Sequence, residues 1–389
     1  MHIAITGIGL TSGLGDGPDE HAAKIRAGEC QLAPLSGLLG AESDYAELSA
    51  SWIQRRDLLC SRKWAPASFL SLHVARQAII DSGLTQDDLR DAAVIVGSSR
   101  GNIAGWVSPW PGRRPFGLMA ASNSMHGELA SAVSIEFGIR GPWQVISSGC
   151  AASLDALGMA NMMLRQGMVK RAIVIGVELP LMDEVLDVYA QTGVLSSTAV
   201  NDPWSPETSG FFPGEAGAAL VLESFSNIEE KPDAVSLTGY WCNSDADSPI
   251  GMPEDGAGLR ELLTKAVADL ENEPAITAVC PHASGTLLHG KAELSALHES
   301  LPAGDPVSLH PLKPFTGHTV GASGVLDVAI LTDFLRKREL PPNLPNLTQP
   351  EGFNLSPNDL DPGGSTVLKI AVGMGGHNSA VSLRTPAQA

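Results

Sequence analysis

The sequence predicts an α/β protein built as two packed halves, and three observations support this class. Segments typical of strands alternate with segments typical of helices along the 389 residues. A second series of strands and helices in similar order follows the first, with a boundary near residues 224–231. The composition is 43% hydrophobic and only 17% charged, with 41 glycines and 27 prolines, which suits a large core joined by tight turns. We therefore expect residues 1–226 to form one half and residues 227–389 the other.

Apolar runs place the strands and helices of the first half. The strands are expected at Ile3–Thr6, Ala93–Gly97, Gln144–Ile146, Ala172–Val177 and Ala218–Leu222. The helices are expected at Trp64–Ser82, Met125–Phe137 and Ala151–Leu164.

The second half repeats this alternation. Its strands are expected near Val235–Tyr240, Thr277–Val279, Val307–Leu309, Thr366–Val372 and Ala380–Arg384. Its helices are expected at about Gly258–Leu270 and Gly324–Leu335.

Cys150 lies between a predicted buried strand, which includes Val145 and Ile146, and a predicted apolar helix. A thiol at a helix N-terminus faces unpaired backbone N–H groups and the positive end of the helix dipole, which favour a thiolate and lower the thiol pKa. The arrangement resembles the strand–nucleophile–helix turn of acyl-transfer enzymes. An inert core cysteine is the alternative, because free cysteine is among the most buried residue types.

Two histidines follow predicted strands further along the chain. His282 lies in Cys280-Pro281-His282-Ala283-Ser284-Gly285-Thr286, and His318 ends Lys313-Pro314-Phe315-Thr316-Gly317-His318. Loops after the strands of α/β proteins carry active-site residues, so each is a candidate catalytic imidazole. Taken singly, each could equally be a surface or core histidine. A zinc site of Cys280, His282 and His289 is a further alternative, but the spacing matches no common ligand pattern.

Taken in order, these motifs resemble the β-ketoacyl-[acyl carrier protein] synthase family, in the branch that uses one cysteine and two histidines. The similarity covers nearly the whole chain. It rests on Cys150, His282, Lys313 and His318, and on the segments Ile3-Ala4-Ile5-Thr6-Gly7-Ile8-Gly9, Gly141-Pro142, Gly214-Glu215-Ala216-Gly217-Ala218-Ala219-Leu220-Val221-Leu222-Glu223, Pro341-Pro342-Asn343-Leu344-Pro345-Asn346-Leu347 and Gly373-Met374-Gly375-Gly376-His377-Asn378. The resemblance implies the duplicated, five-layered αβαβα fold of thiolase-like enzymes.

The resemblance also implies a decarboxylative Claisen condensation. Cys150 would carry the acyl chain as a thioester, and His282 and His318 would stabilise the enolate formed when malonyl-carrier protein loses CO₂. Lys313 would belong to the catalytic set, with Asp327, Ser284, Thr286 and Glu215 in supporting roles. The backbone near Cys150 and Met374 would form the oxyanion hole, and Met374, Gly375 and Gly376 would gate the acyl pocket. No metal or cofactor is expected beyond the phosphopantetheine that the carrier protein brings.

Several residues depart from the family pattern. Gly149 stands where alanine is usual, Met374 replaces a common phenylalanine, Gly290 replaces a common aspartate, and Asp202-Pro203-Trp204-Ser205 replaces Arg-Pro-Phe-Asp. These differences favour a synthase of a specialised fatty acid or polyketide pathway, such as an aryl polyene pathway, over housekeeping fatty acid elongation.

Three other functions compete with this prediction. A thiolase would need a second cysteine in the final glycine loop, where this chain has His377. A coenzyme A-primed starter synthase would pair its cysteine with one histidine and an asparagine. A mainly structural chain-length-factor subunit would lack the nucleophile, although a heterodimer with such a subunit stays open beside a homodimer.

The net charge of −18 argues against nucleic acid as a partner. It also opposes an acidic carrier protein, so docking would need a local basic patch. The pairs Arg62–Lys63 and Arg113–Arg114 fall where the family keeps docking residues, with solvated surface charge as the alternative. Five unevenly spaced cysteines, the absence of a signal peptide and the absence of a long apolar run predict a cytoplasmic protein without a membrane span.

Overall fold

The computed structural model describes residues 1–107, 125–302, 306–361 and 363–386. The N-terminal half contributes five main strands to one large sheet, β1 (His2–Ser12), β5 (Ala93–Gly97), β6 (Trp143–Ile146), β7 (Arg171–Glu178) and β8 (Ala216–Phe225), and a short strand that pairs with the end of β1. Their order is β6-β5-β7-β8-β1. The pairs of β5 with β6 and β7 are parallel, whereas β8 runs antiparallel to both β7 and β1.

The C-terminal half repeats this arrangement strand for strand. Its strands are β9 (Val235–Ser244), β10 (Ile276–Cys280), β11 (Ser308–Leu309), β12 (Thr366–Gly373) and β13 (His377–Arg384). Their order is β11-β10-β12-β13-β9, with the same sequence of parallel and antiparallel pairs. The two sets of five join where Ala4 and Ile5 of β1 pair with Ser236 and Val235 of β9. This matching order is the duplication that the sequence predicted, although the exact division at residue 226 stays a prediction.

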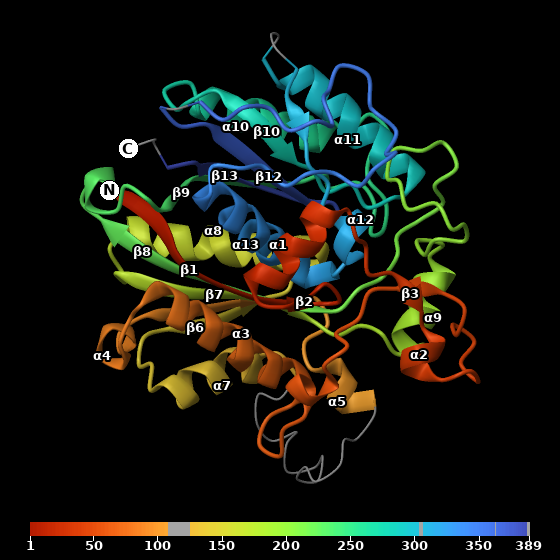
Figure 1. Cartoon of the computed structure of the whole chain (residues 1–389), viewed down its shortest axis with the longest axis horizontal. Helices are drawn as coiled ribbons and strands as arrows, with labels where there is room; N and C mark the ends of the chain where they lie inside the picture. Colours follow the sequence, from red (N-terminus) through yellow and green to blue (C-terminus); the bar gives the residue numbers. More distant parts are fainter. Residues whose placement is uncertain (108–124, 303–305, 362, 387–389) are drawn as a thin grey trace.

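Helices form three layers around these strands (Figure 1). Helices α3 (Pro66–Ser82) and α7 (Gly127–Phe137) cover the outer face of the N-terminal strands, and α10 (Ala257–Asp269) and α11 (Leu287–Ser300) cover the outer face of the C-terminal strands. Helices α8 (Ala152–Arg165) and α13 (Ser323–Arg336) lie between the two sets of strands. Residues 323–335 of α13 are all buried, as expected for a helix that is apolar on every side. The layers confirm the predicted five-layered αβαβα, thiolase-like fold.

The remaining elements are short. They are α1 (Pro18–Ala27), α2 (Ser36–Leu39), α4 (Gln86–Leu89), α5 (Ile103–Val107), α9 (Asp183–Gln191), α12 (Lys313–Thr316), β2 (Gly15–Asp16), β3 (Ala33–Pro34), β4 (Ser49–Ala50) and 3₁₀ turns at Arg56–Leu59, Gly149–Ala151, Ile228–Glu230 and Val320–Ala322. Among the described residues, no helix has the length and hydropathy needed to cross a membrane.

Strand β1 is longer than predicted, since it continues beyond Thr6 to Ser12. The glycines in this stretch do not end the strand, because they let α3 pack closely against it. A Cβ atom at Gly7 would lie 2.1 Å from the carbonyl oxygen of Ala78, and one at Gly9 would lie 2.3 Å from that of Val74. Glycine in a strand interior thus marks a close helix–strand contact here.

The local structure differs from the sequence analysis in two places: one expectation was wrong and one helix was not predicted. Val145 and Ile146 are only half-buried, because β6 is the last strand of the sheet and one of its edges has no neighbouring strand among the described residues. Helix α11 was not expected at all, since the glycine, histidine and lysine in its first turns obscure the apolar period. This omission matters because α11 borders the candidate site.

Candidate active site

The two halves present equivalent turns at the carboxyl ends of equivalent strands. In the first half, β6 leads through the 3₁₀ turn Gly149–Ala151 into α8, and Cys150 is the middle residue of that turn. In the second half, β11 and α12 lead through the 3₁₀ turn Val320–Ala322 into α13, and His318 lies directly before that turn. Gly149 (φ +62°) and Gly317 (φ +66°) precede Cys150 and His318 in the left-handed region, where glycine carries no steric cost.

His282 reaches the same place from the end of β10. The chain leaves the strand at Cys280, and Ala283 takes a positive φ of 42° before α11 begins at Leu287. Glu293 of α11 fixes this turn, because its carboxylate accepts hydrogen bonds from the backbone N–H groups of His282 (2.5 Å) and Ala283 (2.8 Å).

The fold brings the three predicted side chains together, although they are far apart in the sequence. The Nε2 atom of His318 lies 3.2 Å from the Sγ atom of Cys150. The ring of His282 lies 5.2 Å from that of His318, centroid to centroid, at an interplanar angle of 86°. All three side chains are at least 95% buried, so they meet in an environment that excludes most water.

The expectation of a lowered thiol pKa at Cys150 was wrong for the resting protein. Burial raises the pKa of the thiol to about 11, although the Lys313 and Arg100 charges and a hydrogen bond from the backbone N–H of Met374 act in the opposite direction. The resting Cys150 side chain is therefore a thiol, which would have to lose its proton for the sulfur to act as a nucleophile.

Both imidazoles are neutral at pH 7. Burial is the main cause that lowers the pKa of His282 and of His318 well below the usual value, and the nearby Lys313 charge lowers both further. A neutral imidazole has one N–H donor and one lone pair. It can therefore accept a proton from a thiol or donate a hydrogen bond to an oxyanion, depending on its tautomer.

Ser323 makes both tautomers of His318 accessible. Its hydroxyl lies 3.2 Å from Nδ1 of His318 and 3.1 Å from the hydroxyl of Thr319. A hydroxyl is both donor and acceptor, so it can accept from Nδ1–H or donate to the Nδ1 lone pair. The Nε2 atom that faces Cys150 can thus carry a lone pair or a hydrogen.

Buried charges hold the main chain on either side of His282. The Nζ atom of Lys313 donates to the His282 carbonyl (2.5 Å), and the Nζ atom of Lys369 donates to the Pro281 carbonyl (3.2 Å). Lys369 also pairs with Asp327 at 2.6 Å. The direct partner of Asp327 is therefore Lys369, a residue that the sequence analysis did not single out.

Lys369 and Glu293 were both missed as site residues. Lys369 is fully buried in β12, and a single lysine within the apolar run Thr366–Gly373 was a signal that could have revealed it. Glu293 is fully buried as well, but nothing in its local sequence distinguishes it from the exposed Glu299 of the same helix.

A cavity of about 240 Å³ opens beside Cys150 and the two histidines. Met374 lies against the sulfur, and Ser284 and Thr286 present hydroxyls to the same cavity, 3.2 Å from each other. The cavity wall consists mainly of Cys150, Gly193, Val194, Phe211, Ile250, Gly251, Met252, His282, Ser284, Thr286, Leu288, His289, His318, Val372, Gly373 and Met374. Its mixture of apolar and hydroxyl groups suits an acyl chain on a polar arm.

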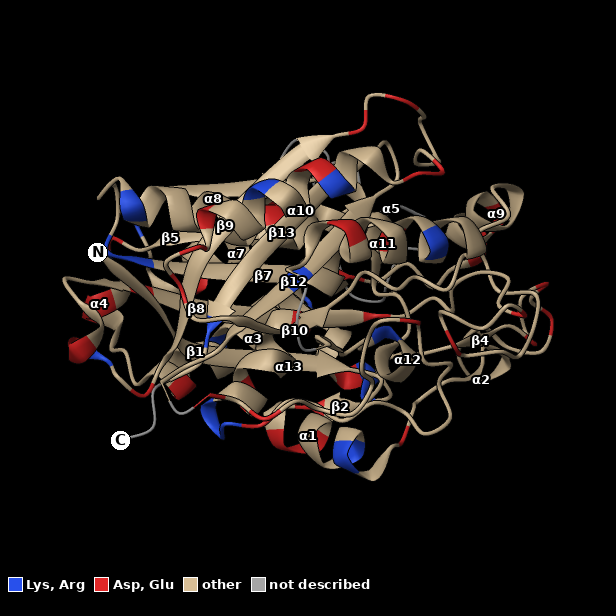
Figure 2. Cartoon of the chain, turned by 90° about the horizontal axis from the view of Figure 1, so that it is seen from above, with Lys and Arg blue, Asp and Glu red and all other residues tan. Residues whose placement is uncertain are grey.

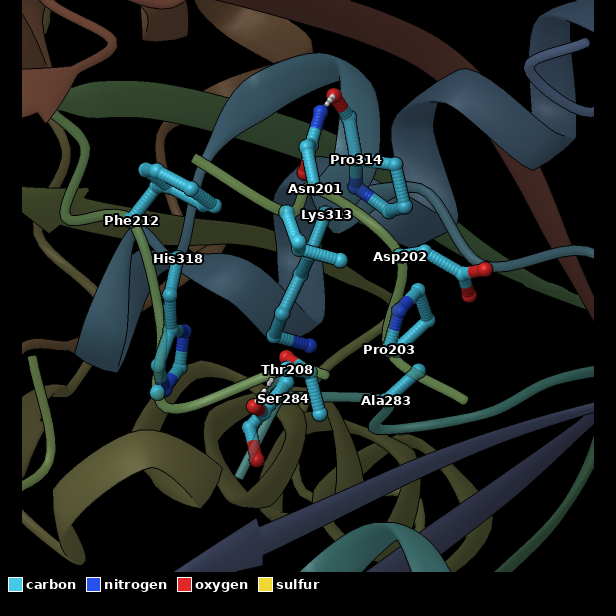
Figure 3. Close-up of a pocket in the computed structure, with 13 residues that line it drawn as sticks. Asn201, Asp202, Pro203, Thr208, Phe212, Ala283, Ser284, Lys313, Pro314 and His318 are labelled. Carbon is cyan, nitrogen blue, oxygen red and sulfur yellow. Dashed lines mark hydrogen bonds between the residues drawn. The ribbon is translucent and has the colours of Figure 1, made fainter. Parts of the chain in front are cut away.

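A smaller pocket adjoins the other side of His318 (Figure 3). There Lys313 points from α12 toward Ser284 and Thr208, and Thr208 donates to the Gly285 carbonyl (2.7 Å). The Asp202–Pro203 segment lies beside Ala283, so this departure from the family pattern borders the turn that carries His282.

Glu215 and the last two glycines of the closing loop support the site from outside. Glu215 accepts from Arg56 and from the backbone N–H of Ile53 (3.3 Å), so it holds the preceding loop and does not line the cavity. Gly376 continues the turn after Met374, where its carbonyl accepts from the backbone N–H of Asp245 (2.7 Å). Gly375 takes a positive φ of 93° in the same turn.

The candidate docking residues divide into three cases. Arg62 is exposed, and Lys63 is exposed but paired with Glu136 and stacked on Trp64, 4.7 Å from the ring centroid. Arg113 and Arg114 lie outside the described residues. Figure 2 shows the Lys and Arg segments lying apart from one another among more numerous Asp and Glu segments.

The zinc alternative finds no support in the geometry. Cys280 lies beside Lys369 and Asp327, whereas His282 and His289 line the cavity. Over the described ranges, no cluster of three or more histidine, cysteine or acidic side chains is arranged to hold a metal ion.

Comparison with known proteins gives one consistent result. Residues 1–227 match the family described as β-ketoacyl synthase, N-terminal domain, and residues 235–346 match β-ketoacyl synthase, C-terminal domain. The tetracenomycin polyketide synthase ketoacyl synthase alpha subunit of Streptomyces glaucescens is 25% identical over 420 residues, covering 99% of this chain and 97% of that protein. Polyketide synthase ThaG of Burkholderia thailandensis is 28% identical over 337 residues, covering 84% of this chain but only 6% of that much longer protein.

Solved structures share the fold. A type II polyketide synthase ketosynthase bound to its acyl-carrier protein and a hexaketide superposes with a TM-score of 0.82 at 22% identity, covering 99% of both chains. An oxazolomycin ketosynthase domain of Streptomyces albus gives a TM-score of 0.83 at 19% identity, over all of this chain and 74% of that one.

Proposed function

The chain belongs to the β-ketoacyl synthase family, and we propose that it is an active condensing enzyme that joins an acyl group on Cys150 to malonyl-acyl carrier protein. The observation that carries the proposal is the 3.2 Å contact between His318 Nε2 and Cys150 Sγ, with a second neutral imidazole beside it. A chain-length-factor subunit has a mainly structural role and would not need a cysteine beside two histidines.

Acyl transfer to Cys150 is the first half-reaction. His318, with a lone pair on Nε2, accepts the thiol proton as the sulfur attacks the acyl thioester of the carrier's phosphopantetheine. The same proton then passes to the departing pantetheine thiolate, which leaves His318 neutral. The backbone N–H of Met374, which already points at the sulfur, is placed to stabilise the tetrahedral oxyanion together with that of Cys150.

Condensation is the second half-reaction. The malonyl thioester carbonyl lies between His282 and His318, whose N–H groups donate to the oxygen as CO₂ leaves and negative charge moves onto it. The enolate carbon attacks the acyl carbon, and the bond to the Cys150 sulfur breaks. The thiolate then takes a proton from Nε2–H of His318, which is replaced from water. Loss of CO₂ drives the step forward, so the chemistry needs no cofactor beyond the carrier's phosphopantetheine.

The backbone hydrogen bonds that fix the position of His282 support its proposed role as a hydrogen-bond donor to the oxyanion. Lys313, Lys369 and Glu293 hold both carbonyls and both N–H groups around it. Donors that are fixed before the reaction need no reorganisation when charge develops, which is the main source of electrostatic catalysis.

The pathway and the partners belong to this proposal too. Polyketide relatives support a specialised fatty acid or polyketide pathway, and the ketosynthase–carrier complex among the structural neighbours supports a carrier protein as partner. The exposed edge of β6, where Trp143 is 37% exposed, is suited to a second subunit, which we propose is another copy or a chain-length-factor-like chain. Cytoplasmic localisation fits five cysteines that are all free thiols.

The test separates the two half-reactions. The wild-type protein, given acyl- and malonyl-carrier protein, should yield a β-ketoacyl-carrier product and an acyl adduct on Cys150 by mass spectrometry. Cys150→Gln should lose condensation but keep malonyl decarboxylation, because the imidazoles remain. Cys30→Ser, at an exposed cysteine, is the matched control and should behave as wild type. An acyl adduct on Cys30, or wild-type condensation by Cys150→Gln, would disprove the assignment.

A further inference from the structure

A third imidazole lines the cavity, and the proposed chemistry does not use it. His289 is the third residue of α11, and its ring lies 4.8 Å from that of His282, centroid to centroid, at an interplanar angle of 69°. Both rings belong to the wall of the same cavity as Cys150 and Met374.

The ring of His289 is buried but lacks hydrogen-bond partners. The residue is 8% exposed, and neither Nδ1 nor Nε2 has a partner within hydrogen-bonding distance. The nearest charged atom is Oε2 of Glu293, 3.7 Å from Nδ1, which is too long for a hydrogen bond. Since an unpaired buried polar group costs free energy, two such atoms on a ring that lines a cavity indicate a polar ligand.

The position of His289 shows which substrate it would meet. The rings form a row in which Cys150 contacts His318, His318 faces His282, and His282 faces His289. His289 is thus separated from the acyl-carrying sulfur by the two imidazoles that receive the malonyl thioester carbonyl. Leu287 and Leu288, its neighbours in the first turn of α11, are 44% and 42% exposed, so this side of the cavity faces the outside.

We propose that His289 binds the carboxylate of the malonyl group, and so selects the extender substrate over an unsubstituted acyl thioester. This inference rests on the proposed function. In malonyl the carboxylate is one carbon away from the thioester carbonyl, so a carbonyl held by His282 places the carboxylate in reach of a neighbouring ring. Among the two substrates only the extender carries this anion.

Charge and tautomer support this role. Burial lowers the pKa of His289 while Glu293 raises it. An arriving carboxylate adds a second negative charge beside the ring and favours the doubly protonated form, which has an N–H to donate to that carboxylate. Because the carboxylate is present before CO₂ leaves and absent afterwards, the contact strengthens substrate binding without lowering the barrier.

The experiment is a comparison of KM and kcat in His289→Phe and His289→Gln. Phenylalanine keeps a ring against His282 but removes both nitrogens, and glutamine restores one N–H near the Nε2 position. For His289→Phe we expect KM for malonyl-carrier protein to rise roughly tenfold or more, as for the loss of a hydrogen bond to a charged group. We expect kcat to be unchanged or higher, because the lost contact stabilises bound substrate at least as much as the transition state. Acylation of Cys150 by acyl-carrier protein should be unchanged, and His289→Gln should recover most of the KM. His298→Phe, an exposed histidine later in α11, is the matched control.

A binding measurement checks the same idea without turnover. Wild-type protein should bind a malonyl-pantetheine amide more tightly than an acetyl-pantetheine amide, and His289→Phe should lose this preference. An unchanged KM in His289→Phe, or a fall in kcat alone, would overturn the inference, because the ring would then be inert or would act by positioning His282. A wild-type protein that does not condense would instead refute the proposed function.

Discussion

Replacing Lys369 by methionine tests the buried charges behind His282. The Nζ atom of Lys369 lies 2.6 Å from Asp327 of α13 and 3.2 Å from the Pro281 carbonyl, and both charged side chains are at most 1% exposed. Burial, the largest single effect, lowers the pKa of Lys369, but Asp327, Cys280 and Glu293 together raise it above the usual value, so the lysine is charged. Lys369→Met keeps most of the side-chain volume and removes the charge.

The expected loss of stability is large. Removing one partner of a buried ion pair leaves the other charge without compensation and costs about 3–5 kcal/mol. Replacing both partners by apolar residues removes this penalty, so Lys369→Met combined with Asp327→Leu should be more stable than Lys369→Met alone. Condensation by the single variant should also fall, because the carbonyl before His282 loses its donor.

Urea unfolding at pH 7, followed by circular dichroism, measures the free energies of a double-mutant cycle. Lys337→Met is the control, since Lys337, the residue directly after α13, makes an ion pair with Asp333 at 2.8 Å but is 41% exposed. An exposed pair contributes at most about 1 kcal/mol. If Lys369→Met lowers the free energy of unfolding by no more than Lys337→Met does, the buried ion pair does not stabilise the segment that carries His282.

Three further predictions concern pH, packing and docking. The Asp155 carboxylate raises the pKa of His377, against a smaller effect of burial. This pair, with a 2.8 Å contact, therefore stabilises the fold fully below the unfolded pKa of about 6.5 and loses its effect as pH rises through the raised folded pKa. The difference in unfolding free energy between wild type and His377→Gln should shrink at alkaline pH, and a constant difference would contradict this. Gly9→Ala should destabilise the protein by about 1–3 kcal/mol or more, because α3 has to move, and an unchanged urea midpoint would refute the close packing. Arg62→Glu should raise KM for carrier-bound substrates while sparing small thioester mimics, and an equal change for both would exclude a docking role.

Local patterns were sufficient for the order of elements and for the three reactive side chains. Apolar runs between turn residues predicted ten strands of the main sheet, nine of them to within a few residues, and β5 was predicted with its observed bounds. Strand β1 was predicted six residues too short at its end. Cys150, His282 and His318 stand out because each follows a strand and lies among small residues, which is a property of nearby sequence. Family resemblance then added the expectation that they meet.

Only the tertiary structure determined the protonation states of the site residues and the contacts that fix their positions. The thiol pKa of Cys150 depends on burial, which outweighs the helix terminus and the nearby cations, and burial comes from segments distant in the chain. The partner of Asp327 is Lys369, 42 positions away along the printed sequence, because α13 packs against β12. The exposure of β6 likewise follows from its place at the end of the sheet. Each of these properties depends on distances through space between residues that are remote in sequence, whereas the predicted elements depend on the few residues within each run.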